Sequence, residues 1–243
     1  LVLWLLYIHL SKMKFTLQSI TEGQLLLVDK PLQMTSFQVV NKIRWGLKNK
    51  YSLKKLKVGH AGTLDPLASG LLIICTGKMT KKINELQDLE KTYTGTITLG
   101  AITASYDLET PIDKKFPINH LNEESLIAAS KKFKGEIDQY PPIYSAIKKK
   151  GKRLYEYARS GEKIQIDSRK VTIHHFDLKK IKLPDLNFEV KCSKGTYIRS
   201  LANDFGKSVN SGGYLSSLRR TAVGSFKVKN ALTPQELLKK LEL

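Results

Sequence analysis

Apolar residues gather in short runs along this chain, and each run predicts an element of regular structure. Residues 71–76 form an apolar run between two glycines, which predicts a strand buried on both faces. Residues 24–31 predict a second strand, which ends at a proline. The β-rich alternation at residues 92–100 predicts a third strand.

Helical periodicity marks the segments between these strands. Apolar residues recur at helical spacing after Thr35 or Ser36, either of which can cap the helix. Residues 79–89 predict a short helix. Asn122 is placed to cap a helix that runs to about residue 133.

The second half of the chain predicts further strands. Residues 171–178 and 187–192 predict a pair of strands, and residues 223–228 predict the last one. Residues 101–113 predict a polar loop. This mixture of strands and helices indicates an α+β protein.

Two helices complete the pattern. Thr196 can cap a helix that opens within residues 194–202. Thr233 begins a capping box with Pro234 at the first helical position, which predicts a closing helix. Arg199 lies in the first turns of the earlier helix, where the helix dipole mildly disfavours a cation. We therefore expect Arg199 to have a carboxylate partner.

The stretch before the central strand has the composition of a loop. Residues 59–70 contain three glycines, one proline, His60 and Asp65. A polar, glycine-rich loop at the end of a rigid strand is a good place for a catalytic group, so Asp65 is the candidate catalytic carboxylate. The plainer alternatives are an Asx-turn or a cap for Asp65 and an ordinary hydrogen-bonded loop histidine for His60.

The charge of the chain bears on its partner. The 243 residues include 41 Lys+Arg against 22 Asp+Glu, a formal net charge of +19. This balance favours nucleic acid, and the alternative is a solvated, lysine-rich surface. Residues 140–159 mix Lys and Arg with Tyr, which suits looped RNA but also a loop followed by an amphipathic helix. The basic connector at residues 51–57 faces either phosphate or solvent.

Missing motifs exclude several kinds of site. Cys75 and Cys192 have the surroundings of core thiols, which suits a reducing cytosol, and no zinc-ligand spacing is present. Neither a Walker loop nor a nucleophile elbow occurs. Residues 1–10 are apolar but too short to span a bilayer. We expect them to be an extension before a working protein that starts near Met13, or a short helix packed on the body.

The letters G-H-A-G-T-L-D-P-L-A-S-G at residues 59–70 closely resemble the catalytic-loop signature of the TruB family of tRNA pseudouridine synthases. Agreement with the family continues in the same order over roughly residues 24–226. The other matching segments are residues 27–31 with Thr35 and Ser36, 77–81, Lys91 with Tyr93, 142–159, 192–201 and 218–221.

The resemblance implies an α+β pseudouridine-synthase fold, in which helices flank a mixed, mostly antiparallel sheet with a central catalytic cleft. It also implies an isomerase, an intramolecular transferase that converts uridine 55 in the T-loop of tRNA to pseudouridine. The uridine flips out of its stack, the C1′–N1 bond breaks, and the uracil turns and rejoins through C5. The resemblance implies no cofactor and no metal.

Family roles map onto individual residues of this chain. By resemblance, Asp65 is the catalytic aspartate, which attacks C1′, attacks the base or removes a ribose proton. Tyr93 stacks on the flipped uracil and serves near the proton transfer at C5, and Arg199 pairs with Asp65. His60 takes the space of the flipped nucleotide, and Leu218 lines the base pocket. Three further substrate-binding positions are Lys30, Asp107 and Tyr197.

The resemblance also implies a domain organisation. We expect an extension at residues 1–12 and a catalytic domain at 13–228. An RNA-gripping insertion at about 140–170 is expected to be mobile without RNA. Residues 229–243 form a short C-terminal helix, and no complete PUA domain is expected.

The expected partner is the T-arm stem-loop of tRNA, bound by a cytoplasmic, bacterial-type monomer with no membrane and no metal partner. Two other classes of function compete with the enzyme. A non-catalytic tRNA-binding module is disfavoured because Asp65, Tyr93 and Arg199 are all present. A ribosome-associated structural protein would have no use for the intact glycine loop.

Overall fold

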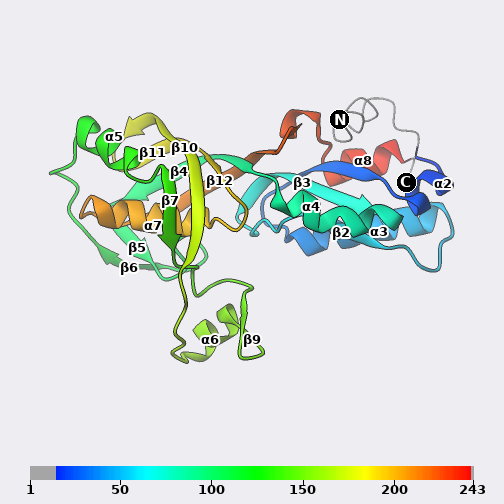
Figure 1. Cartoon of the computed structure of the whole chain (residues 1–243), viewed down its shortest axis with the longest axis horizontal. Helices are drawn as coiled ribbons and strands as arrows, with labels where there is room; N and C mark the ends of the chain where they lie inside the picture. The colour runs from blue at the N-terminus through cyan, green and yellow to red at the C-terminus, as the bar shows by residue number, and fades with distance from the viewer. Residues whose placement is uncertain (1–14, 242–243) are drawn as a thin grey trace. The chain divides into compact units, whose positions relative to one another are not determined.

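The structure, a computed structural model, describes residues 15–241. The chain folds into two compact units (Figure 1). The discontinuous unit contains the described residues up to Leu89 together with those from Arg219 onward. The inserted unit is the continuous stretch Glu90–Leu218. The extension expected at residues 1–12 lies outside the described residues.

Antiparallel strands form the centre of the discontinuous unit. β1 (Leu25–Lys30) pairs with β3 (Ala68–Thr76) from Leu25 opposite Cys75 to Lys30 opposite Gly70. On its other side, β3 contacts β2 and the last residues of β12. The remaining strands of this unit are β2 (Val58–His60), the end of β12 (Gly213–Val223) and β13 (Phe226–Lys227).

Helices cover both faces of these strands (Figure 1). Leu72 and Ile74 of β3 pack into one apolar cluster with α3 and α8, whereas Leu71 and Ile73 pack into another with α4. The prediction that the central strand is buried on both faces is therefore confirmed. The helices of this unit are α2 (Leu17–Glu22), α3 (Ser36–Lys50), η2 (Gly77–Lys82), α4 (Ile83–Asp88), η3 (Val228–Asn230) and α8 (Pro234–Lys240).

The inserted unit is built on strands in the order β12, β4, β11, β10 and β7. The pairs β4–β11, β11–β10 and β10–β7 are all antiparallel. The bounds of these strands are Lys91–Leu99 for β4, Gly135–Gln139 for β7, Arg169–Lys182 for β10 and Asp185–Cys192 for β11.

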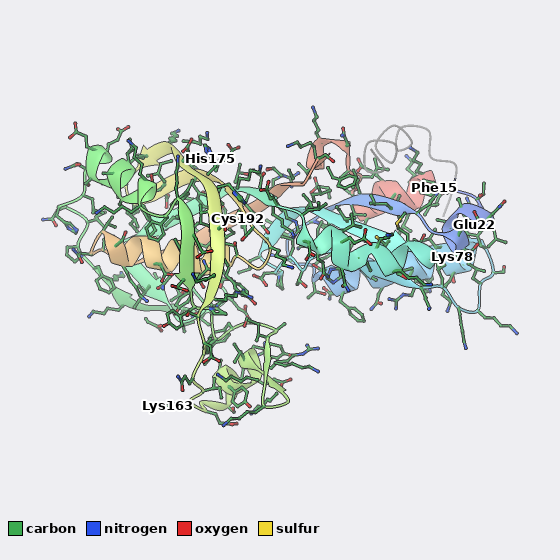
Figure 2. The ribbon with its side chains drawn as sticks, viewed as in Figure 1. Phe15, Glu22, Lys78, Lys163, His175 and Cys192 are labelled. Carbon is green, nitrogen blue, oxygen red and sulfur yellow. The ribbon has the colours of Figure 1, made fainter. Side chains whose placement is uncertain are left out.

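An aromatic cluster holds the helices of the inserted unit on its sheet. Phe205 of α7 packs at right angles to Phe176 of β10, with ring centroids 5.7 Å apart, and Phe133 and Phe188 extend the cluster. Buried Cys192 lies on β11, labelled in Figure 2. The other elements are α5 (Glu123–Lys131), α6 (Leu154–Ser160), α7 (Ile198–Ser208), and the hairpins β5–β6 (Ala101–Thr103, Ile112–Lys115) and β8–β9 (Lys148–Lys149, Lys152–Arg153).

The architecture confirms the predicted α+β class, with a mostly antiparallel sheet flanked by helices. The helix caps at Thr35, Asn122 and Thr233 are confirmed, each as part of a capping box. Both cysteines are buried and free, as expected of core thiols.

Several sequence predictions were wrong. The last long strand is Gly213–Val223 rather than residues 223–228, because Gly224 turns the chain back at φ +53° into the short β13. The expected polar loop at 101–113 contains β5 and the start of β6. Thr196 does not cap α7: its hydroxyl donates to Ser193 O (3.0 Å), and Tyr197 is the N-cap residue.

Candidate catalytic site

The candidate site residues are divided between the two units. Lys30, His60 and Asp65 belong to the discontinuous unit. The inserted unit contains Tyr93, Asp107, Tyr197, Arg199 and Leu218.

Asp65 lies on a short loop that is held at both ends. β2 ends at His60 and β3 begins at Ala68, so the loop is shorter than residues 59–70 suggest. The Ala68 amide donates to Asp65 O (3.1 Å). Ser36, the first residue of α3, exchanges two hydrogen bonds with Leu64: its Oγ donates to Leu64 O (3.0 Å) and accepts from Leu64 N (2.8 Å). Asp65, half-buried, is thereby fixed against a helix terminus.

Arg220 supports the same loop from within the protein. Its side chain is almost fully buried. Nε donates to Leu71 O (2.7 Å) and Nη2 donates to Gly62 O (3.0 Å). One guanidinium thus ties the loop before Asp65 to the strand after it. The sequence prediction gave Arg220 no role, because the carbonyls that it binds lie about 150 residues away.

Lys30 is a second buried cation in this unit. Its ammonium donates to Pro31 O (2.9 Å) and Met34 O (2.6 Å). Burial lowers the pKa of Lys30 to about 8, the charge of Arg220 acts in the same direction, and the carboxylate of Asp65 opposes both. The charges of Lys30 and Asp65 therefore act on each other within this unit.

His60 is kept neutral by its surroundings. Burial lowers its pKa, the charge of Arg220 lowers it further, and a hydrogen bond with the Gly62 backbone opposes both. A neutral imidazole is less costly to remove from water than an imidazolium would be.

In the inserted unit, Arg199 has the carboxylate partner that its position in α7 led us to expect. Its Nε lies 3.6 Å from Oδ2 of Asp107, and both side chains are buried. Its Nη1 donates to Ser105 O (3.2 Å) and Tyr144 O (3.0 Å). The pairing of Arg199 with Asp65 would join the two units and stays a prediction.

A tight turn presents Asp107 to Arg199. Tyr106 has φ +64°, a left-handed conformation that is uncommon for a residue with a large side chain. Oδ1 of Asp107 accepts from the Glu109 amide (3.0 Å), and its backbone carbonyl accepts from the Thr103 hydroxyl (2.7 Å). These bonds leave Oδ2 directed toward Arg199.

Tyr197 is held at the start of α7. The guanidinium of Arg169 lies over its ring, 4.5 Å from the centroid. Gln139, which the sequence prediction missed, binds the backbone of Tyr197 at both its N–H and its C=O. Tyr93 is buried in β4, and Leu218 is half-buried in β12.

Residues 140–170 carry the expected mixture of cations and tyrosines. Tyr155 lies between Arg153 and Arg159, whose guanidinium carbons are 5.8 and 5.2 Å from its centroid. Tyr157 is instead buried and donates to Lys149 O (3.0 Å), so one tyrosine packs inward while the other stays at a basic surface. Figure 2 shows the segment extending from the sheet of the inserted unit, with Lys163 at its outer end.

Within residues 15–241, no three His, Cys, Asp or Glu side chains gather in a way that could hold a metal ion. No helix in the same part of the chain is both long and apolar enough to cross a bilayer.

Comparison with known proteins supplies a family. Residues 48–198 match the model described as TruB family pseudouridylate synthase (N terminal domain). A Flavobacterium johnsoniae protein named tRNA pseudouridine synthase B is 63% identical over 212 residues, which cover 87% of this chain and 93% of the relative. A Phocaeicola vulgatus protein of the same name is 49% identical over 212 residues, covering 87% and 90%.

Solved structures share the fold. A chain in the crystal structure of a Cbf5–Nop10–Gar1 complex is 30% identical with a TM-score of 0.68, and the match covers 91% of this chain and 55% of that one. A chain of an H/ACA RNP bound to a substrate RNA containing 2′-deoxyuridine is 28% identical with a TM-score of 0.64, covering 90% and 53%. This chain therefore spans just over half the length of those solved chains, and the predicted fold is confirmed.

Proposed function

Because the chain belongs to the TruB family of pseudouridylate synthases, we propose that it converts uridine 55 in the T-loop of tRNA to pseudouridine. The enzyme class, an isomerase that acts on tRNA, follows from the family and from relatives named tRNA pseudouridine synthase B. The observation that carries the finer proposal is the loop around Asp65, which holds one half-buried carboxylate beside buried cations.

The reaction exchanges one bond to the ribose for another. The C1′–N1 bond breaks, the uracil turns, and C5 bonds to C1′. C5 gives up its proton and N1 gains one, so substrate and product have the same composition. Asp65 acts as a carboxylate, by attacking C1′ or the base or by removing a ribose proton. In all three routes the charge of buried Lys30 acts on this carboxylate.

The target base must leave its stack before Asp65 can reach the ribose, at a cost of a few kcal/mol. In the proposal, neutral His60 fills the space that the flipped nucleotide leaves. Tyr93 stacks on the uracil and Leu218 lines its pocket. Tyr197 and Lys30 complete the substrate contacts.

Arg199 pairs with Asp65 in this proposal and keeps it ionised. The support within the inserted unit is the way Arg199 is held: it is buried, and Asp107 and two carbonyls fix its guanidinium. A cation that is already oriented loses little side-chain entropy when it meets its anion.

The basic segment at residues 140–170 grips the T-arm. Its exposed cations suit phosphates, and Tyr155 and the 61%-exposed Tyr140 suit stacking on bases. We expect fast amide exchange in this segment without RNA and protection when tRNA binds. Equal protection in both states would contradict this expectation.

The proposed setting is the cytoplasm, where the free thiols of Cys75 and Cys192 stay reduced. The proposed working form is a monomer on tRNA. Nop10 and Gar1 are partners in the complex of the Cbf5 relative, and they are not part of this proposal.

The test uses an unmodified tRNA transcript tritiated at uridine C5, because isomerisation releases that tritium to water. We expect release with the wild-type protein and none with Asp65→Asn, while both bind the transcript. Asp113→Asn, a change of an exposed aspartate, is the matched control and should release tritium like the wild type. Mapping the product should place the pseudouridine at position 55.

One other outcome would support the second candidate function, a non-catalytic tRNA-binding module. Binding by the wild type and by Asp65→Asn without any tritium release would reject the enzyme and leave Asp65 as a structural loop residue.

A further inference from the structure

Gln139 occupies an unusual position between a strand and a helix of the inserted unit. It is the last residue of β7, and its side chain is fully buried. Its Oε1 accepts from Tyr197 N (2.7 Å), and its Nε2 donates to Tyr197 O (3.0 Å). The side-chain amide thus makes the two bonds that a neighbouring strand would make with Tyr197.

Two more hydrogen bonds join the same segments. The Ser200 hydroxyl donates to Tyr140 O (2.8 Å), and Arg199 Nη1 donates to Tyr144 O (3.0 Å). These hydrogen bonds form a junction between the beginning of the RNA-gripping segment and the first turn of α7, which carries Arg199.

The junction is costly to break. The C=O of Tyr197, the N-cap residue of α7, also accepts from the Leu201 amide (3.1 Å), the first bond of the helix. Because Gln139 is buried, loss of its amide removes the acceptor for Tyr197 N–H and one of the two donors to Tyr197 O. Arg169 of β10 lies opposite Gln139 of β7 in the sheet. Its guanidinium also lies over the ring of Tyr197, so Arg169 contributes to the same junction.

We propose that Gln139 is a positioning residue that fixes the first turn of α7 to the base of the RNA-gripping segment and so sets the guanidinium of Arg199 for the reaction. This inference rests on the proposed function. Gln139 contacts neither substrate nor reacting atoms, and it acts through Tyr197 and Arg199. RNA bound by the segment and the cation at the reacting centre are then parts of one hydrogen-bonded assembly.

The first variant is Gln139→Leu, which removes both bonds with little change in volume. We expect the single-turnover rate of tritium release from the C5-tritiated transcript to fall by about 10–100-fold, because a misplaced reacting group costs on that order. The dissociation constant of the transcript should stay within about threefold, since a positioning defect lowers the rate rather than binding. Gln18→Leu, a change of an exposed glutamine, is the matched control.

The second variant, Gln139→Glu, gives a pH-dependent readout, measured over the pH range in which thermal unfolding shows the variant to be folded. The carboxylate keeps the acceptor for Tyr197 N but faces Tyr197 O with a second acceptor, and only its protonated form can donate there. Burial raises the pKa of such a carboxyl. The rate of Gln139→Glu divided by that of the wild type should therefore rise as the pH falls, whereas the ratio for Gln139→Leu should not.

Three results would overturn the positioning role. They are a wild-type rate in Gln139→Leu, a loss confined to tRNA affinity, and a pH-independent rate ratio in Gln139→Glu. If Gln139→Leu does not fold, as thermal unfolding would show, the Gln139→Glu ratio decides alone. Absence of tritium release by the wild-type protein is a different result, because it rejects the proposed function itself.

Discussion

Two neighbouring arginines in β12 have opposite environments. Arg220 is buried, and its guanidinium donates to carbonyls of the loop before Asp65 and of β3. Arg219 is 42% exposed and binds Asp29 through two bonds of 2.6 and 3.0 Å. A buried donor to several carbonyls matters more for stability than a surface ion pair, because its loss leaves acceptors unpaired away from water.

Substituting the two arginines separately tests this difference. Arg220→Met should lower the free energy of unfolding by about 2–4 kcal/mol, because Gly62 O and Leu71 O lose their donor. Arg219→Met is the matched control and should cost about 0–1 kcal/mol. Denaturant unfolding of both variants measures the two values. Equal losses would contradict the supporting role of Arg220.

A second prediction at this scale concerns the protonation of His60. Its pKa in the folded protein lies below the ordinary value, chiefly through burial and then through Arg220. At acid pH below about 6.5 the unfolded chain therefore binds more protons at this position than the folded one, so stability is lost as the pH falls through this window. The histidine resonance that disappears in His60→Gln should titrate below 6.5. A measured pKa at or above 6.5 would contradict the buried position of His60 near the charge of Arg220.

At the scale of elements, close approach of β3 and β12 depends on Gly70. Gly70 has φ +106°, and a Cβ there would lie 2.3 Å from Arg220 O and 2.7 Å from Arg220 N. The contact is with backbone of the adjacent strand, which cannot move aside as a side chain could. Any larger residue would therefore separate the strand that follows Asp65 from the strand that carries Arg220.

Gly70→Ala should destabilise the protein clearly more than Gly135→Ala. Gly135 is a matched control because its φ is +104° and a Cβ there would meet nothing within 4 Å. The control reports the backbone cost alone, about 1 kcal/mol, and Gly70→Ala adds the clash. Thermal or denaturant unfolding gives both values. Similar losses of stability in the two variants would show that the β12 backbone can move to accommodate the added methyl group.

Elements whose signals are local could be predicted from the sequence, and those whose signals are distant could not. The strand at β3 and the caps at Thr35 and Asn122 depend on near neighbours, and they were found. The start of α7 was misplaced because Tyr197 is held by Gln139, 58 residues earlier. The long strand β12 was missed because Arg220 looks polar in the sequence, while the carbonyls that accept from it lie about 150 residues away.

The same contrast applies to the candidate site. The glycine-rich letters around Asp65 predicted a loop, which lies between β2 and β3. The position of Arg199 in a first turn predicted a carboxylate partner, which is Asp107. Nothing local marked Arg220 or Gln139 as supports, because each acts through bonds to distant backbone.

For the whole molecule, the dominant quantity is the net charge of +19. Phosphates bound by Lys and Arg release counterions, so affinity falls as salt rises. If tRNA binding involves about 6–10 phosphates, affinity should fall by about 10³–10⁵ between 50 and 200 mM salt. Filter binding of the tRNA transcript over this range measures the slope. A slope near zero would mean that the basic surface is solvated and unused.

The order of the two units along the chain also has a consequence during synthesis. The inserted unit is continuous and can emerge whole from the ribosome, whereas the discontinuous unit waits for the residues after Leu218. Arg220 emerges 158 residues after Gly62, a delay of about 8–30 s at ordinary translation rates. Through this interval β3 lacks its β12 neighbour, so a nascent chain exposes part of an apolar strand edge. The loop around Asp65 reaches its final form only after Arg220 has emerged.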